Sequence, residues 1–141
     1  MNRKDKKLLL LILLTFLIIL NFILSTTYRN YIYDNSINDF GLADVGYNIF
    51  AVLTISITSW LGLFQLTQNK LIDILLFTLA YVIWEFLTLK FSSLGTFDKK
   101  DLMALCLSGI ITLLLLYFVD KFTFQTDWLK IKSYLNKYKS F

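Results

Sequence analysis

Carboxyl groups are the side chains of this sequence best suited to chemistry. The 141 residues include ten acidic side chains, of which Glu85 is the single Glu, but no His and only one Cys, Cys106. A Ser-His-Asp triad and a His-ligated zinc site are therefore excluded, and a disulfide framework needs more than one Cys. The five glycines are isolated, which excludes the Gly-rich loops that bind nucleotides.

Glu85 is the most informative acid because it lies inside a long apolar segment. A charge there costs about 2.5–3.5 kcal/mol on insertion scales, so it normally faces protein or trapped water. Thr78, Tyr81, Glu85 and Thr88 fall on one face at helical spacing, which predicts a polar stripe directed inward. An interhelical hydrogen bond in a packed core is the alternative interpretation, and we favour a functional site.

Five aspartates lie in the two segments that we expect to face outward, where Lys and Arg are scarcest: Asp34, Asp39, Asp44, Asp98 and Asp101. If the helices form one bundle, both segments cover the same end, close to Glu85. Helix capping also explains several of them. Asp98 has the position of an N-cap, Asp101 lies in the first turn after it, and Asp44 precedes another apolar segment.

Long apolar segments make up most of the chain, which is 57% hydrophobic with a mean hydropathy of +0.63. A helix that spans a membrane needs about 20 mainly apolar residues. Four segments approach this length: residues 8–24, 47–66, 71–91 and 102–119. We predict an all-α integral membrane bundle of four transmembrane helices, which forms one domain over residues 1–126.

The distribution of Lys and Arg predicts how this bundle is oriented. Ten of these residues lie in the N-terminal head, the second loop and the C-terminal segment, whereas four lie in the other two loops. The positive-inside rule places both termini in the cytoplasm. The net charge of +4 therefore indicates membrane topology rather than binding to nucleic acid. The first apolar segment is long for a signal peptide, and we expect it to be retained as an anchor helix.

Residues 127–141 have the pattern of an amphipathic helix. Trp128, Ile131, Leu135 and Tyr138 fall on one face, with four Lys among them. We predict a basic amphipathic cytoplasmic tail that lies along the inner leaflet, attracted by anionic lipid. A solvated tail that only enforces the orientation is an equally open alternative.

Small residues at helical spacing indicate close packing between membrane helices. Thr54, Thr58 and Gly62 form one such ladder in the second apolar segment. A second ladder consists of Asp101, Ala104, Ser108 and Thr112. These ladders predict that the last three helices pack around Glu85.

Two longer motifs carry a family resemblance. Glu85 is followed by Gly-Thr-Phe-Asp-Lys-Lys-Asp-Leu-Met-Ala at residues 95–104, with Gly109 further on. Residues 39–48 read Asp-Phe-Gly-Leu-Ala-Asp-Val-Gly-Tyr-Asn. Both motifs resemble the VanZ-like family of membrane proteins, in which a Glu precedes an Asp-x-x-Asp pair. Lys, His and Gln are common in the family at the positions of Val45, Asn48 and Leu89.

The resemblance implies a small integral protein of the bacterial cell envelope with four or five membrane helices. Some members of the family are associated with antibiotic resistance, to the lipoglycopeptide teicoplanin. The resemblance does not imply an agreed biochemical activity.

We therefore predict a non-catalytic protein of the bacterial inner (plasma) membrane with an outward-facing acidic pocket. The pocket would bind a polar or cationic ligand, such as a lipoglycopeptide or a lipid headgroup. The predicted ligand-binding residues are Glu85, Asp98, Asp101, Asp44, Asp39, Asn48 and Tyr81. We expect neither a metal nor a cofactor. The expected partners are the lipid bilayer, this ligand and a further membrane protein, but no nucleic acid.

Two alternatives stay open. A membrane enzyme could use paired carboxylates on a lipid-linked substrate, or hold Mg²⁺ through Asp98 and Asp101. An assembly subunit would instead dock onto other membrane proteins through the polar face and the basic tail.

Overall fold

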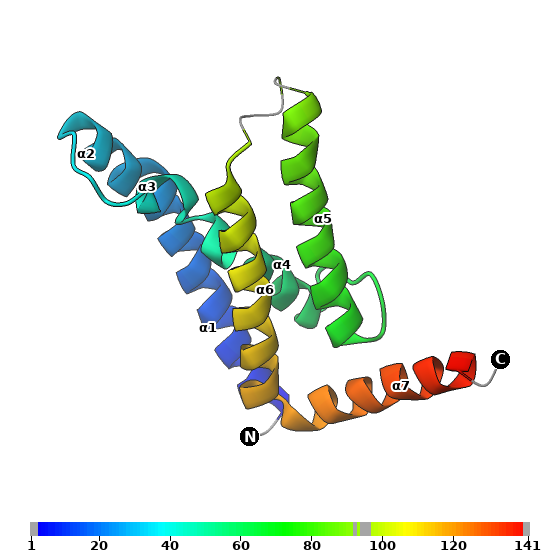
Figure 1. The fold of residues 1–141 in the computed structure, drawn as a ribbon. Coiled ribbons are helices and arrows are strands. Elements are labelled where there is room, and N and C mark those ends of the chain that lie inside the picture. Colours follow the sequence, from blue (N-terminus) through cyan, green and yellow to red (C-terminus); the bar gives the residue numbers. More distant parts are fainter. Residues whose placement is uncertain (1–2, 92, 94–96, 140–141) are drawn as a thin grey trace.

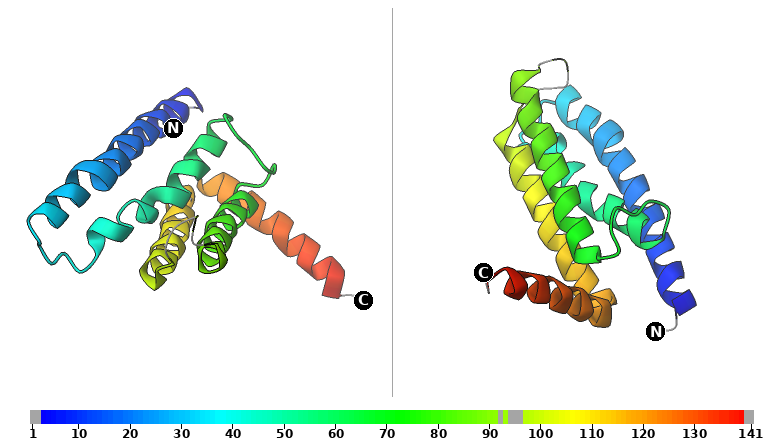
Figure 2. Two further views of the ribbon diagram at one scale, coloured as in Figure 1. Left: turned by 90° about the horizontal axis from the view of Figure 1, so that it is seen from above. Right: turned by 90° about the vertical axis from the view of Figure 1, so that its right-hand side faces the viewer.

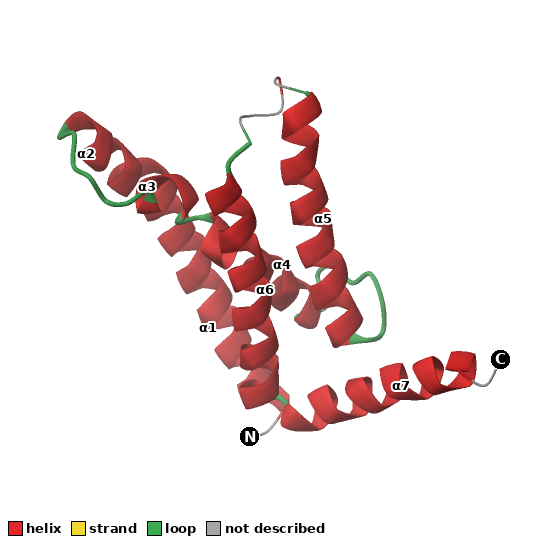
Figure 3. Ribbon diagram, in the orientation of Figure 1, coloured by secondary structure: helices red, strands yellow, loops and turns green. Residues whose placement is uncertain are grey.

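The computed structural model of this protein describes residues 3–91, 93 and 97–139. Every regular element in these ranges is helical (Figures 1 and 3), which confirms the all-α prediction. The elements in chain order are α1 (Arg3–Phe22), η1 (Ile23–Tyr28), α2 (Arg29–Asp34), α3 (Leu42–Val45), η2 (Asn48–Phe50), α4 (Ala51–Trp60), α5 (Lys70–Lys90), α6 (Lys99–Val119) and α7 (Lys121–Lys139).

Three helices are long and apolar enough to cross a membrane: Lys4–Asp34, Lys70–Lys90 and Lys99–Val119. They correspond to three of the four predicted segments. In the most apolar stretch of the first helix, only 11% is buried within the protein. Exposed apolar surface of this extent is unusual in a water-soluble monomer. The structure is therefore compatible with a membrane location.

The first helix continues past its predicted end at residue 24. α1, η1 and α2 follow one another as far as Asp34, and η1 is a π-helical turn. The hydroxyl groups of Thr26 and Ser25 donate to the carbonyl oxygen of Phe22 at 2.6 and 3.2 Å. These bonds satisfy the two hydroxyl groups within the π-helical turn, so the helix continues past polar residues of types that also favour helix ends.

The second predicted segment, residues 47–66, forms a shorter helix than expected. The 3₁₀ turn η2 leads into α4, and together they cover Asn48–Trp60, about 20 Å at 1.5 Å per residue. Gly62 ends the helix with φ +84°. Its N–H donates to the carbonyl of Ser59 at 2.9 Å, and the next N–H donates to that of Thr58 at 3.2 Å. This pattern is a Schellman cap, which requires a left-handed residue.

α4 lies between α1 and the α5–α6 pair (Figure 2). On one side, Leu53 and Ile57 pack against buried leucines of α1. On the other side, Val52 belongs to a second buried cluster with Ile74 of α5 and Leu116 of α6. The short helix α4 therefore joins the long helices into one bundle.

Small residues bring α6 close to both α4 and α5: the Ser108 hydroxyl of the second ladder accepts the backbone N–H of Val52 in α4 at 3.1 Å, and Gly109 lies against α5. Ser108 and Thr112 are fully buried. A Cβ added to Gly109 would lie 2.7 Å from the hydroxyl oxygen of Thr78, so a larger residue would force the helices apart. The ladder prediction is wrong for Gly62. A Cβ there would meet no atom within 4 Å, because this glycine ends α4 rather than packing.

α7 crosses one end of the bundle at a steep angle to α6 (Figure 1). It begins at Lys121, so the predicted boundary between residues 126 and 127 falls inside the helix. Asp127 is only 3% exposed, and its carboxylate accepts the backbone N–H of Lys70 at 2.8 Å. The start of α7 is therefore attached to the start of α5.

The predicted apolar face of α7 is only partly covered. Ile131 packs against the buried cluster of α4, α5 and α6, whereas Trp128 and Leu135 are mostly exposed. The side chain of Tyr138 and residues 140–141 lie outside the described part of the chain.

Candidate functional site

A cavity of about 580 Å³ lies at the end of the bundle opposite α7. The end of α5 and the start of α6 form one side of it, and α2, α3 and η2 contribute the other. Its charged lining residues are Arg29, Asp44, Glu85, Asp98 and Asp101. The uncharged polar and aromatic residues around it are Tyr33, Tyr47, Asn48, Tyr81, Trp84 and Thr88. Four carboxyl groups therefore share one cavity with one guanidinium group.

Glu85 joins the end of α5 to the start of α6. Its side chain is buried, with 8% of the residue exposed. The Oε1 atom accepts the backbone N–H of Asp98 at 3.0 Å. One turn further along, the hydroxyl of Thr88 donates to the backbone carbonyl of Glu85 at 2.7 Å. Glu85 thus faces inward, as the polar stripe predicts, and not toward the exposed apolar surface.

The two aspartates at the start of α6 have different roles. Asp98 is the N-cap, since its side chain accepts the backbone N–H of Lys100 at 2.8 Å. Asp101 lies in the first turn, where the helix dipole favours an anion. Its Oδ1 atom accepts a hydrogen bond from the Nδ2 group of Asn48 at 2.7 Å. This bond links η2 to α6, and both residues line the cavity.

Asp44 enters the cavity from the other side. It lies within α3, not in front of α4, so the expectation that it caps α4 is wrong. The chain turns through α3 and η2 before α4 begins, which separates Asp44 from the start of α4. Its Oδ1 atom accepts a hydrogen bond from the hydroxyl of Tyr33 and lies 3.5 Å from Nη2 of Arg29.

Asp39 is the one predicted ligand-binding residue that does not line this cavity. Its carboxylate accepts the N–H of Gly41 at 3.0 Å and that of Ala43 at 2.6 Å, and the hydroxyl of Tyr28 donates to it at 3.2 Å. Desolvation acts to raise the pKa of Asp39, but these hydrogen bonds outweigh it and lower the pKa below 3.8. The geometry gives Asp39 a local role in the turn that starts α3.

Six of the seven predicted residues therefore lie around one cavity: Glu85, Asp98, Asp101, Asp44, Asn48 and Tyr81. The predicted set of ligand-binding residues did not include Arg29 and Tyr33, which follow the predicted end of the first helix at residue 24. Their spacing of four residues would place them on one helix face, and the Arg29 guanidinium lies 5.6 Å from the centre of the Tyr33 ring.

Four of the five charged groups that line the cavity are carboxyl groups, which act as hydrogen-bond acceptors when ionised. Carboxylates accept hydrogen bonds from ammonium, guanidinium and hydroxyl groups, and they attract cations. Within the described ranges, no three His, Cys, Asp or Glu side chains are arranged to hold a metal ion. The arrangement is suited to a ligand that carries cationic or hydroxyl donors.

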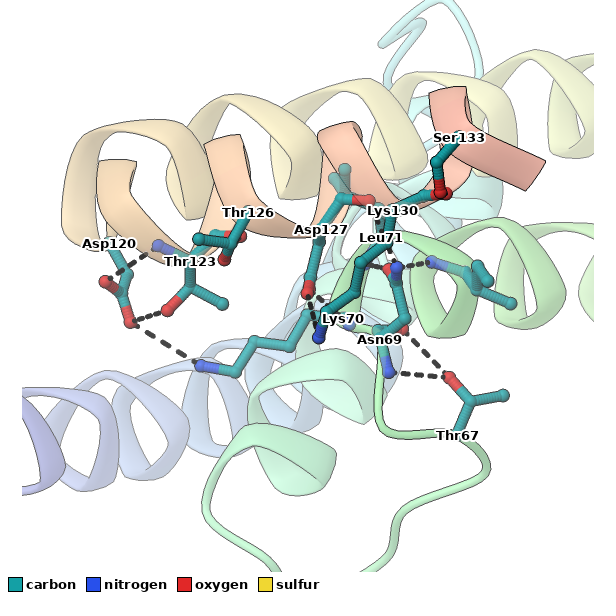
Figure 4. Close-up of polar contacts among 11 residues, drawn as sticks. Thr67, Asn69, Lys70, Leu71, Asp120, Thr123, Thr126, Asp127, Lys130 and Ser133 are labelled. Atoms are coloured by element: carbon teal, nitrogen blue, oxygen red, sulfur yellow. Dashed lines mark hydrogen bonds and ion pairs between the residues drawn. The ribbon is translucent and has the colours of Figure 1, made fainter. Parts of the chain in front are cut away.

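A second polar cluster fastens the opposite end of the bundle (Figure 4). Asn69 caps α5, because its side chain accepts the N–H groups of Leu71 and Ile72, and its Nδ2 group donates to the carbonyl of Asp127 at 3.2 Å. The fully buried Asp73 accepts hydrogen bonds from nearby hydroxyl and backbone groups. These contacts fix the position of the start of α5. They therefore also fix the rotation of α5 about its axis, which determines where Glu85 points at the other end.

No match was found among protein-family models, curated proteins or solved structures. The VanZ-like resemblance stays a prediction from the motifs. Two positions of the first motif, Gly95 and Thr96, lie outside the described residues.

Proposed function

We propose that this chain is a non-catalytic membrane protein of the bacterial cell envelope, similar to the VanZ-like family. Its acidic cavity binds a polar or cationic ligand, such as a lipoglycopeptide or a lipid headgroup. The observation that carries the proposal is the convergence of Asp44, Glu85, Asp98 and Asp101 from three separate segments around one cavity of about 580 Å³. A volume between about 300 and 1,000 Å³ is typical of ligand sites.

The carboxylates of the cavity keep acceptor capacity for a ligand. An ionised carboxylate has about four lone-pair sites. Among the described residues, we find one hydrogen bond to the carboxylate of Glu85 and one to that of Asp101. The remaining acceptor sites are suited to a donor-rich or cationic ligand.

The proposed topology has four membrane crossings, including α4, and both termini in the cytoplasm of a bacterial cell. The segments that carry the cavity acids, α3, the end of α5 and the start of α6, lie at one end of the bundle, whereas the start of α1 and the basic helix α7 lie at the other (Figure 1). This separation of charge agrees with the positive-inside rule. It would open the acidic cavity to the outside and place residues 127–141 along the inner leaflet.

Binding to purified full-length protein in lipid nanodiscs tests the proposal. Teicoplanin serves as the lipoglycopeptide probe and spermidine as a compact cation. Glu85→Gln keeps the size of the side chain but removes its charge, and Asp34→Asn is the matched control on the exposed end of α2. We expect Glu85→Gln to weaken binding of at least one probe by about tenfold or more.

The control should change that affinity by less than about twofold. Equal affinities of the wild type and Glu85→Gln for both probes would contradict the proposal, as would an equal loss in the two variants.

A further inference from the structure

A smaller cavity of about 280 Å³ lies at the opposite, basic end of the bundle. It is enclosed by the starts of α1 and α5 and the ends of α4 and α6. Three ammonium groups line it, from Lys6, Lys7 and Lys70, together with the carboxylate of Asp120. This cavity shares no lining residue with the acidic site, so it is a separate place in the fold.

Asp120 holds two of the lysines in place. The Nζ atom of Lys6 lies 3.0 Å from Oδ1 of Asp120, and that of Lys70 lies 3.7 Å from Oδ2 (Figure 4 shows the contact of Lys70). The side chains of Lys6, Lys70 and Asp120 are 32%, 27% and 17% exposed. Three cations against one anion leave this partly buried cavity with a positive charge, which an anionic ligand would balance.

Trp60 is a second feature of the cavity wall, independent of the lysines. Its indole ring lines the cavity, and Nζ of Lys70 lies 5.8 Å from the ring centre. The indole N–H is buried, and among the described residues it has no acceptor. A buried donor in a native structure normally has a partner. An acceptor would satisfy this donor, and acceptor oxygens are what an anion such as phosphate supplies.

The rest of the wall is apolar. Leu10, Leu116 and Val119 line the cavity beside the lysines, and Leu8, Leu9 and Leu11 are exposed on other faces of the same turns of α1. A ligand with a phosphate group and acyl chains would match both parts. Basic pockets between membrane helices are a recurrent way of binding anionic lipid headgroups.

We propose that this basic cavity is a phosphate-binding site, whose ligand is a phosphate group carried by an anionic phospholipid or free in solution. Lys6 and Lys70 contact the phosphate oxygens as charge-assisted donors, Lys7 adds charge at the edge, and the indole N–H of Trp60 donates to one further oxygen. The site does not depend on the function proposed for the acidic cavity.

The test uses the full-length protein in neutral detergent and native mass spectrometry. Phosphatidylglycerol and phosphatidylcholine are titrated in one arm, and inorganic phosphate in a second arm. Lys6→Gln combined with Lys70→Gln removes two of the cavity charges. Lys130→Gln combined with Lys132→Gln is the control, because it removes two charges of α7 outside the cavity.

We expect the wild type to prefer one phosphate source, and the cavity variant to bind it about tenfold or more weakly. The control should differ from the wild type by less than about twofold. If phosphatidylglycerol is preferred over phosphatidylcholine, the source is a lipid. If only inorganic phosphate shows the dependence on Lys6 and Lys70, the source is soluble. Loss of binding to the same extent in both double variants would overturn the proposal, because general surface charge would explain it.

Trp60→Phe keeps all three lysines and the aromatic ring, and it removes only the N–H group. This variant guards against the case in which the double variant simply fails to fold. We expect Trp60→Phe to lower the affinity for the same phosphate ligand by about threefold to tenfold. Unchanged affinity in both Trp60→Phe and the Lys6 and Lys70 variant would overturn the site.

Discussion

The carboxylate of Glu85 accepts the backbone N–H of Asp98 at 3.0 Å, and this bond connects the last turns of α5 to the residue that caps α6. Glu85 therefore has two functions in the fold. It positions one wall of the acidic cavity, and it supplies charge to the interior of that cavity. The two functions can be separated experimentally. The bond to Asp98 needs only one oxygen of the Glu85 side chain, whereas the negative charge is shared by both oxygens of the carboxylate.

Replacement of Glu85 by Gln and by Leu should separate these two functions. Glu85→Gln retains a carbonyl oxygen that can accept the Asp98 N–H, whereas Glu85→Leu leaves this N–H without its partner. We expect Glu85→Leu to lower the free energy of unfolding by about 1–3 kcal/mol relative to Glu85→Gln. Thermal unfolding in detergent measures the difference. Equal stabilities would show that the bond contributes nothing to the fold.

Gly109 should tolerate no side chain while Thr78 is opposite it. A Cβ at Gly109 would lie 2.7 Å from Oγ1 and 3.2 Å from Cγ2 of Thr78. Gly109→Ala should therefore destabilise the protein by about 1–3 kcal/mol, although Ala favours the helix by about 1 kcal/mol. Thr78→Ala removes both contacting atoms. The double variant should recover most of the loss, and an additive loss in the double variant would count against the close approach.

The sequence predicts the acidic cavity better than it predicts the helix ends. Glu85 could be placed inward because a charge within an apolar helix has few other stable positions, and Asp98 could be recognised as an N-cap from its position before an apolar segment. Both inferences are local. The apolar pattern also predicts the three long helices.

What could not be predicted depends on backbone conformation at the helix ends and in the loop before α3. The end of α4 follows from the left-handed backbone of Gly62, a residue that is equally suited to helix packing. The first helix continues to Asp34 through Ser25 and Thr26, which are residue types that also favour helix ends and turns. By its position in the sequence, Asp39 is counted among the cavity acids, but its carboxylate bonds to the N–H groups of Gly41 and Ala43 in the turn that starts α3.

α7 should separate from the bundle when its buried carboxylate is removed. Asp127 accepts the backbone N–H of Lys70 at 2.8 Å and lies next to the N-cap Asn69, so its loss would leave a buried donor without a partner. We expect Asp127→Ala to increase hydrogen exchange in α7 and the first turn of α5 by about tenfold. Ser133→Ala, on an exposed part of α7, is the control. Unchanged exchange in Asp127→Ala would show that Ile131 and its neighbours hold α7 alone.

Asp120 should make the basic end of the bundle sensitive to acid. Burial acts to raise its pKa, but the hydrogen bonds from Thr123 and Lys6 outweigh burial and lower the pKa below 3.8. Because the pKa is lower in the folded protein than in the unfolded chain, the stabilisation is complete above about pH 4 and is lost as the pH falls through the folded pKa.

The variant Lys6→Gln tests this dependence. It should have a lower Tm than the wild type at neutral pH, and the difference should shrink as the pH falls below about 4. Thermal unfolding followed by circular dichroism over this range measures it. A difference that is the same at both ends of the range would mean that Lys6 acts independently of the charge on Asp120.

We propose that the acidic cavity is open to water on the outer side of the membrane and holds a ligand there. Labelling of Tyr47→Cys in intact cells with a membrane-impermeant maleimide tests it most directly, in a Cys106→Ser background. Leu79→Cys, on the exposed apolar face of α5, is the control. We expect Tyr47→Cys to be labelled from outside and to be protected by teicoplanin or spermidine, whereas Leu79→Cys should not be labelled. Absence of labelling at Tyr47→Cys, or labelling that neither saturating probe reduces, would contradict it.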